Sequence, residues 1–502
     1  MVLLLAVVSV SAAASGVTTY DVVVDGDTAD MNITVELYPE NPDRRTELTT
    51  SWLLPPGTTV RGVSDSDGEL SYTTDGRQVE FTTTITPQEG KEVVTIRGTV
   101  DGVVAEEHRG LDLVQLRLSG FRDQRPDVSE EVTQVRVRTD RPVLSESHSF
   151  GFDAALGSHG ANYSGEGPVN IRLAVSGQGE RYDNFVLFGP GNLSTADDLY
   201  WVPVAVTGFR PQVNRWPVVV YSDEQYDQRV DGWSSGQYRT GGLIFIRNST
   251  LVKDEGPAVV LHEVMHGFNA DALRWTTANR AWFDEGTASY VEWLVNAKRG
   301  VRQAEIFGEE VVWREGRTRY TLPPRKTPGD LLTYYRENRT FMRDWTLFDT
   351  SVDRTFGYAY SELLIRRYVL DHGSASLRPV YSQLRSLNDR LDTAVESLHQ
   401  SNQKILTAME TGFRPCYTTE RDALEQCLEE VHRMEAEVPP LGDLAGTTEK
   451  VDIQPVDPPG EERTDTTAPG NRSTGDDTAT PAQPGFLARL LGRLVAALAS
   501  LF

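Results

Sequence analysis

The chain contains little lysine, cysteine or histidine, and each scarcity narrows its possible functions. Its 502 residues include six lysines, two cysteines and eight histidines. Two cysteines cannot build a disulfide-rich scaffold or a cysteine-only zinc site. Acidic residues outnumber basic ones by 73 to 49, so the net charge is −24 and nucleic acid is excluded as an expected partner.

The acidic, lysine-poor composition also indicates a setting. Arginine supplies most of the positive charge, and a strongly acidic surface is suited to high salt, where its self-repulsion is screened. In this respect the sequence resembles haloarchaeal secreted proteins, and an acidic mesophilic protein is the alternative.

No uninterrupted apolar run is long enough to span a bilayer, but both ends of the chain predict export. Residues 1–16 resemble a signal peptide without its basic leading region. Residues 439–484, rich in Pro, Thr, Asp and Gly, predict a disordered linker. Residues 485–502 predict an amphipathic or membrane-anchoring helix that carries Arg489 and Arg493, or else a tail helix docked on the protein itself. We therefore expect an extracellular or cell-surface protein, tethered to the membrane through this helix.

Two further features are compatible with export. Cys416 and Cys427 could close a short disulfide loop, with two free buried thiols as the alternative. Six N-x-S/T sequons predict a glycoprotein if the chain enters a glycosylating compartment, and they lie at Asn32, Asn162, Asn192, Asn248, Asn338 and Asn471.

Hydrophobic patterning predicts a multidomain α+β protein. Residues 17–196 alternate apolar and polar residues between Gly, Asp and Pro turns, which is typical of an all-β sandwich. Residues 197–300 combine strands with two helical segments, and residues 301–438 are expected to be mostly helical.

The most specific motif is His-Glu-Val-Met-His at residues 262–266. On a helix, His262 and His266 project from one face and can bind one Zn²⁺, while Glu263 beside them can act as a general base. Glu285 is the candidate third ligand, and three protein ligands leave the open position typical of catalytic zinc. The six remaining histidines lack ligand spacing and are expected to be structural or surface residues.

These residues resemble the gluzincin metallopeptidases of the aminopeptidase N and leukotriene A4 hydrolase type. Eighteen residues separate His266 from Glu285, which opens a Glu-Gly-Thr-Ala run similar to the family's N-E-G-F-A. Gly242-Leu243-Ile244 resembles the G-L-I strand that precedes the zinc helix in that family. The resemblance implies one Zn²⁺, a peptide or protein substrate, a thermolysin-like α/β catalytic domain at 197–300 and a substrate-binding role for Gly242.

The resemblance also implies a tyrosine that stabilises the oxyanion. Tyr358 is the first candidate, Tyr360 is the alternative, and both could instead be core residues. Each zinc-binding imidazole also needs an acceptor for its other ring N–H, for which Asp271 and Glu292 are within range.

The sequence departs from the family at two functional positions, one of which is the Lys-Gly of the family's Y-x-K-G run, replaced here by Tyr360-Ser361. Where the family has a Glu that binds the substrate's α-amino group, this chain has Arg239. A cation there repels an ammonium group and can bind a carboxylate, which favours an endopeptidase or carboxylate recognition. The alternative is that Arg239 is a solvated residue at the end of a strand.

Three functions are therefore open. The first is a surface zinc peptidase with Glu263 as base. The second is a zinc hydrolase of a non-peptide substrate, because the resembling family includes an epoxide hydrolase. The third is an inactive cell-surface binding or structural protein, against which the intact Glu263 argues.

Overall fold

A computed structural model describes residues 17–38, 45–86, 91–118, 132–149, 152–232, 234–272, 281–301, 312–315, 318–321, 345 and 351–388. The chain forms two compact units, 1–451 and 452–502, and every described residue belongs to the first. Four predictions lie outside the described residues: the leader at 1–16, the Cys416–Cys427 disulfide, the linker at 439–484 and the helix at 485–502.

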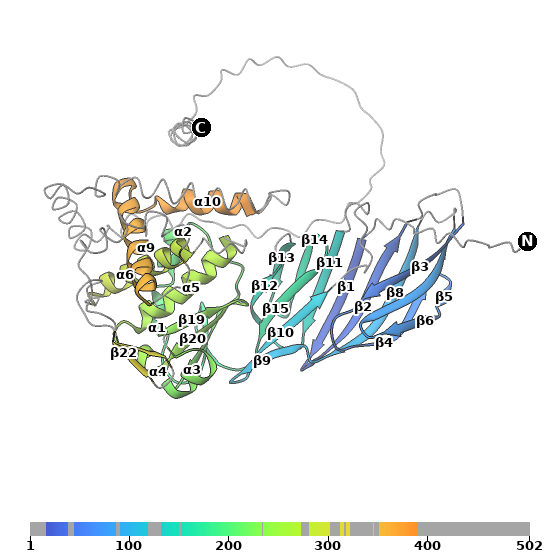
Figure 1. The fold of residues 1–502 in the computed structure, drawn as a ribbon, viewed down its shortest axis with the longest axis horizontal. Coiled ribbons are helices and arrows are strands. Elements are labelled where there is room, and N and C mark those ends of the chain that lie inside the picture. The colour runs from blue at the N-terminus through green and yellow to red at the C-terminus, as the bar shows by residue number, and fades with distance from the viewer. Residues whose placement is uncertain are drawn as a thin grey trace, which may run out of the picture. The chain divides into compact units, whose positions relative to one another are not determined.

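The first part of the described chain consists of strands alone (Figure 1). An eight-stranded sheet has the order β13-β14-β11-β1-β2-β8-β4-β5, a three-stranded sheet β3-β7-β6, and a four-stranded sheet β12-β15-β10-β9. The strands are β1 (Val17–Asp25), β2 (Thr28–Leu37), β3 (Thr46–Leu53), β4 (Thr58–Asp65), β5 (Gly68–Glu69), β6 (Tyr72–Asp75), β7 (Gln78–Ile85), β8 (Glu92–Asp101), β9 (Val104–His108), β10 (Leu111–Leu118), β11 (Val132–Thr139), β12 (Val143–His148), β13 (Phe152–Gly157), β14 (Gly160–Glu166) and β15 (Val169–Val175).

One hydrophobic core joins these three sheets. It contains Tyr20 of β1, Trp52 of β3 and Ile171 of β15, and the rings of Tyr20 and Trp52 lie 6.4 Å apart. Along β8 every second residue is buried, as expected for strands that pack one face on a core. The prediction of a β-rich N-terminal region is confirmed.

A five-stranded sheet of order β16-β17-β18-β20-β19 follows. Strands β17, β18 and β20 are parallel, and β16 and β19 pair antiparallel at the two edges. Its strands are β16 (Glu180–Arg181), β17 (Phe185–Phe188), β18 (Trp216–Tyr221), β19 (Gly236–Arg239) and β20 (Leu243–Arg247), so the sheet begins before residue 197. All six residues of β18 are buried, which is typical of a strand covered on both faces.

Helices accompany this sheet, and the described chain is a mixed α+β structure. They are α1 (Ser194–Asp198), α2 (Trp201–Thr207), α3 (Asp223–Arg229), α4 (Asn248–Leu251), α5 (Gly256–Ala272), α6 (Ala281–Arg299), α9 (Ser351–His372) and α10 (Leu377–Asn388). Within 301–438, which was predicted as mostly helical, a hairpin of β21 (Val312–Glu315) and β22 (Thr318–Thr321) also occurs. No described helix has the length and apolarity needed to cross a membrane.

The two faces of the five-stranded sheet contact different neighbours. Val218 and Ile246 belong to the core that includes Val264 of α5. Val219 and Phe245 belong to a separate core with Leu113 of β10 and Leu144 of β12. One face therefore packs on helices, and the other packs on the four-stranded sheet.

Candidate metal centre

Helices α5 and α6 position the zinc-binding candidates. Helix α5 begins at Gly256, with Pro257 in the first turn, where the missing N–H of proline is not needed. Its apolar residues Val260, Val264 and Phe268 are fully buried, which fixes the orientation of the opposite, histidine-bearing face. Helix α6 begins at Ala281, and its first turn contains Asp284.

His262, His266 and Glu285 come together in three dimensions. Their candidate ligand atoms all lie within 4.8 Å of one another. The Nε2 atoms of both histidines lie 3.6 Å from the same oxygen, Oε2 of Glu285. Tetrahedral zinc with bonds of about 2.0–2.1 Å holds its ligand atoms roughly 3–3.5 Å apart, so the three groups can bind one ion after small movements.

A carboxylate contacts the other nitrogen of each imidazole. The Nδ1 atom of His266 lies 2.8 Å from Oδ1 of Asp284, and that of His262 lies 3.0 Å from Oε2 of Glu292. The His266 contact is also a hydrogen bond, which fixes the tautomer and ring orientation of a metal ligand, whereas the His262 contact meets the distance of an ion pair alone. Of the two predicted acceptors, Glu292 occupies this position, whereas Asp271 lies 3.9 Å from Arg385.

Asp284 is held in turn by residues that the sequence reasoning missed. The Asn269 side-chain amide donates to Oδ1 of Asp284 at 2.8 Å, and it also donates to the hydroxyl of Thr287 at 2.9 Å. The Tyr381 hydroxyl donates to the Asn269 carbonyl oxygen at 2.6 Å. This network joins α5, α6 and α10. The position of Asp284 directly before Glu285 in the sequence could have indicated its role. The position of Tyr381, in contrast, depends on tertiary packing.

The surrounding carboxylates raise the pKa of both imidazoles. Burial lowers the pKa of His266, but Asp284 and Glu285 outweigh it and the resulting pKa is about 9. Burial likewise lowers the pKa of His262, but the nearby carboxylates of Glu285 and Glu292 hold that pKa well above its ordinary value. The centre therefore favours a bound positive charge, which a proton or a divalent cation can supply.

Glu263 is buried beside the centre, with 6% of its surface exposed. Burial raises the pKa of its carboxyl group, and the neighbouring charges of His262 and His266 oppose that rise. Gly236 of β19 lies directly against it, because a Cβ atom at this glycine would be 2.8 Å from Oε1 of Glu263. Only glycine lets the edge strand approach the carboxylate this closely.

The two candidate tyrosines differ in their surroundings. Tyr360 is fully buried in the core, whereas Tyr358 is partly exposed and its ring lies 5.6 Å from that of Trp345. Glu362 is one helical turn beyond Tyr358 on α9; burial raises the pKa of its carboxyl group, and the charge of Arg366, more than that of His262, opposes the rise. Tyr358 shares the helix face of Glu362, so it is the better placed of the two.

Arg239 lies away from the centre. Side chains alternate along β19, so Arg239 faces the opposite side from Gly236 and Tyr238. Its guanidinium carbon lies 4.9 Å from the centre of the Phe245 ring, and it pairs with Glu106 at 3.1 Å. The predicted role of Arg239 in substrate binding does not fit this position.

Gly242 also serves packing rather than the centre. Its φ is +80°, and a Cβ atom there would lie 2.6 Å from Ser145 of β12. The Ser145 hydroxyl donates to the carbonyl oxygen of Gly241 at 2.6 Å. This glycine therefore permits the turn after β19 to pack on the four-stranded sheet, and its substrate-binding role stays a prediction.

The donor set fits a zinc ion. Oε2 of Glu285 is buried without a hydrogen-bond partner among the described residues, a costly state for a carboxylate oxygen. Two neutral imidazoles and one carboxylate are typical ligands of catalytic zinc.

Comparisons with known proteins gave matches among solved structures only. No family model and no curated protein matches the chain. The M1 zinc metallopeptidase of Deinococcus radiodurans is 14% identical, with a TM-score of 0.32, over 86% of this chain and 96% of that one. A mutant of that enzyme bound to a Tyr-Ser-Ala substrate is 13% identical, with a TM-score of 0.33, over 86% and 96%. Native yeast LTA4 hydrolase is 10% identical, with a TM-score of 0.35, over 81% and 68%. Identities and TM-scores of this size do not establish membership of a family.

Proposed function

We propose that this protein is a zinc-dependent hydrolase that cleaves peptide bonds. His262, His266 and Glu285 are the metal ligands, and Glu263 is the general base. The observation that carries the proposal is the convergence of two histidine Nε2 atoms on one buried, unpartnered carboxylate oxygen, beside the buried Glu263.

The chemistry divides between the ion and the protein. When bound, zinc lowers the pKa of a water molecule to about 7 and polarises the scissile carbonyl group. Glu263 accepts the proton of the attacking water and delivers it to the leaving amine. A raised pKa suits this carboxyl group to both steps. Tyr358 donates a hydrogen bond to the oxyanion.

The outer contacts support the ligands. Asp284 and Glu292 hold the two imidazoles so that their Nε2 atoms face Glu285. Asn269 limits the rotation of the Asp284 carboxylate through its 2.8 Å hydrogen bond. A centre that is held in place in this way loses little free energy to reorganisation when substrate binds.

Location is also part of the proposal. The composition of residues 1–16 and 439–502 favours an enzyme that acts outside the cell and is tethered to its surface.

Cleavage profiling of a mixed peptide library in high salt with zinc tests the proposal, with Glu263→Gln as the matched variant. This substitution keeps the size of the side chain but removes the base. We expect cleavage by the native protein alone and the same zinc content in both proteins. Internal cleavage identifies an endopeptidase, and stepwise loss of amino-terminal residues identifies an aminopeptidase. Equal cleavage by both proteins, or none by the native protein, contradicts the proposal.

A further inference from the structure

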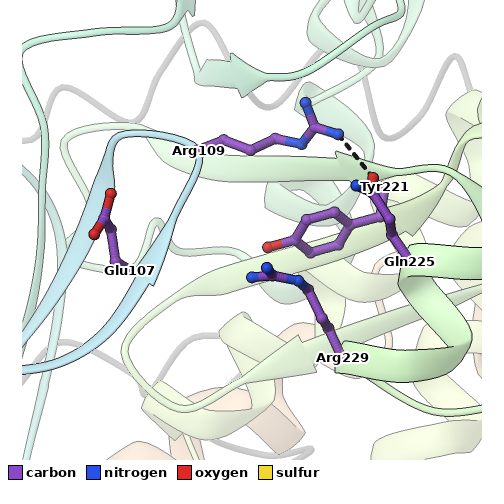
Figure 2. A pocket seen from close by; sticks show the side chains of 5 residues that line it. All are labelled: Glu107, Arg109, Tyr221, Gln225 and Arg229. Carbon is purple, nitrogen blue, oxygen red and sulfur yellow. Dashed lines mark hydrogen bonds between the residues drawn. The ribbon is translucent and has the colours of Figure 1, made fainter.

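A polar cavity of about 530 Å³ lies on the face of the five-stranded sheet opposite the metal centre. Its lining residues are Glu107, Arg109, Tyr221, Gln225 and Arg229 (Figure 2). Arg109 comes from the turn between β9 and β10, Tyr221 ends β18, and Gln225 and Arg229 lie one turn apart on α3. The cavity is therefore lined by the four-stranded sheet, the five-stranded sheet and α3.

The two arginines converge on one aromatic ring. The guanidinium carbon of Arg109 lies 5.4 Å from the centre of the Tyr221 ring, and that of Arg229 lies 5.7 Å from it. In Figure 2 they appear on either side of that ring in the view. Arg109 donates to Oε1 of Gln225 at 3.0 Å, which leaves the amide NH₂ group of Gln225 as a further donor.

Neither guanidinium has a carboxylate within 4.0 Å among the described residues. Other arginines of the chain do have one, such as Arg141 with Asp112 at 2.7 Å and Arg239 with Glu106 at 3.1 Å. Two like charges beside one cavity repel each other, and an anion bound in the cavity relieves this repulsion.

The backbone at Arg109 supplies an independent observation. Its φ is +54°, the only positive φ of a non-glycine residue in the described chain. With Gly110 at +84°, it forms the two-residue connection between β9 and β10, where Asn, Asp or Gly is preferred. An arginine in this conformation costs roughly 1 kcal/mol. The strain places a guanidinium over Tyr221, which an asparagine at the same site would not do.

We propose that this cavity binds a small oxyanion bearing a carboxylate or phosphate group. Arg109 and Arg229 supply the positive charge of the cavity lining, and the Gln225 amide supplies a neutral donor. Glu107 also lines the cavity, and its carboxylate lowers the affinity for any anion. The site is independent of the zinc proposal, since none of its residues contacts the metal ligands.

Titration calorimetry on the full chain tests this site, using inorganic phosphate and succinate separately at constant ionic strength set with NaCl. The test variants are Arg109→Asn, which suits the turn, and Arg229→Gln. The control is Arg117→Asn, which removes the same charge from an exposed residue of β10. Arg117 lies six residues along the strand from Leu111, the first residue after the turn that carries Arg109, and this spacing corresponds to roughly 20 Å.

We expect saturable binding of at least one anion by the native chain and by Arg117→Asn. Each test variant should weaken it roughly tenfold or more, the usual effect of losing a charge-assisted contact. Arg109→Asn should not lower the unfolding temperature without anion, because the turn is relaxed. If only phosphate binds, the ligand of this site carries a phosphate group. If succinate binds, the site accepts a carboxylate. No saturable binding, or equal binding by native protein and test variants, overturns the proposal.

Discussion

The Nδ1 atom of His266 lies 2.8 Å from Oδ1 of Asp284, the residue that directly precedes Glu285. Adjacent residues of α6 therefore supply a candidate metal ligand and the group that orients another ligand. Asn269 donates to the same Oδ1 atom, so two residues of α5 hold this carboxylate of α6. The position of one imidazole thus depends on a contact outside the three candidate ligands.

Substituting Asp284 by Asn should weaken zinc binding by roughly 10–100-fold, because the His266 ring loses its charged acceptor. The control is Asp271→Asn, which removes the same charge from α5 but faces Arg385 at 3.9 Å. Competition with a fluorescent chelator measures both affinities. Equal affinities for the two variants would show that the His266–Asp284 contact does not support the metal.

Tyr358→Phe should reduce kcat by about 10²–10³-fold, the effect of losing an oxyanion donor. Zinc content and unfolding free energy should change little, because this side chain is only partly buried. Tyr360→Phe, in the core, should retain kcat. Steady-state kinetics on both variants decide the assignment, and loss of kcat in Tyr360→Phe alone would reverse it.

Arg239→Gln should leave the pattern of cleavage products unchanged, because the guanidinium faces Phe245 and Glu106 rather than Glu263. Stability should fall by no more than about 1 kcal/mol, as is usual for a partly exposed ion pair. Peptide-library profiling and urea unfolding measure the two effects. A shift toward amino-terminal trimming in this variant would restore Arg239 as a specificity residue.

Alkaline pH should destabilise the fold in part through Tyr200. Burial raises the pKa of this residue to about 12, although the Trp216 indole N–H donates to its hydroxyl. An unfolded tyrosine has a pKa of about 10, so its contribution is complete below pH 10 and is lost as the pH rises to about 12. The loss is about 1.4 kcal/mol per pH unit in that window.

Tyr200→Phe should therefore lose less unfolding free energy between pH 9 and about pH 11.5 than the native chain. Urea unfolding at the two pH values measures this difference. The control is Tyr72→Phe, at an exposed position on β6, which should decline as the native chain does. Equal declines in Tyr200→Phe and native protein would assign the alkaline loss to other groups.

Local sequence patterns predicted much of the fold and the three candidate metal ligands. The four-residue spacing of His262 and His266 is a property of one helix, so the sequence defines it completely. The strands at 20–24, 79–83 and 132–137 also follow from alternation, which records burial on one face. The start of the five-stranded sheet at Glu180 was missed, because two-residue β16 has too little pattern to be read.

The remaining features depend on tertiary packing. Arg239 could be aligned with a functional position, but which face of β19 it occupies follows from how that edge strand pairs with β20. Tyr381 and Asn269 are 112 positions apart and meet only because α10 packs near α5. The close approach of Gly236 to Glu263 likewise has no local signal.

Zinc titration of the native chain beside Glu285→Gln tests the central claim most directly. The native protein should bind one zinc ion per chain. Replacement of the proposed ligand oxygen should weaken affinity by more than the roughly 10–100-fold expected for an outer contact. Uptake of no zinc by the native chain, or equal affinity in Glu285→Gln, would contradict the assignment of His262, His266 and Glu285 as a metal centre.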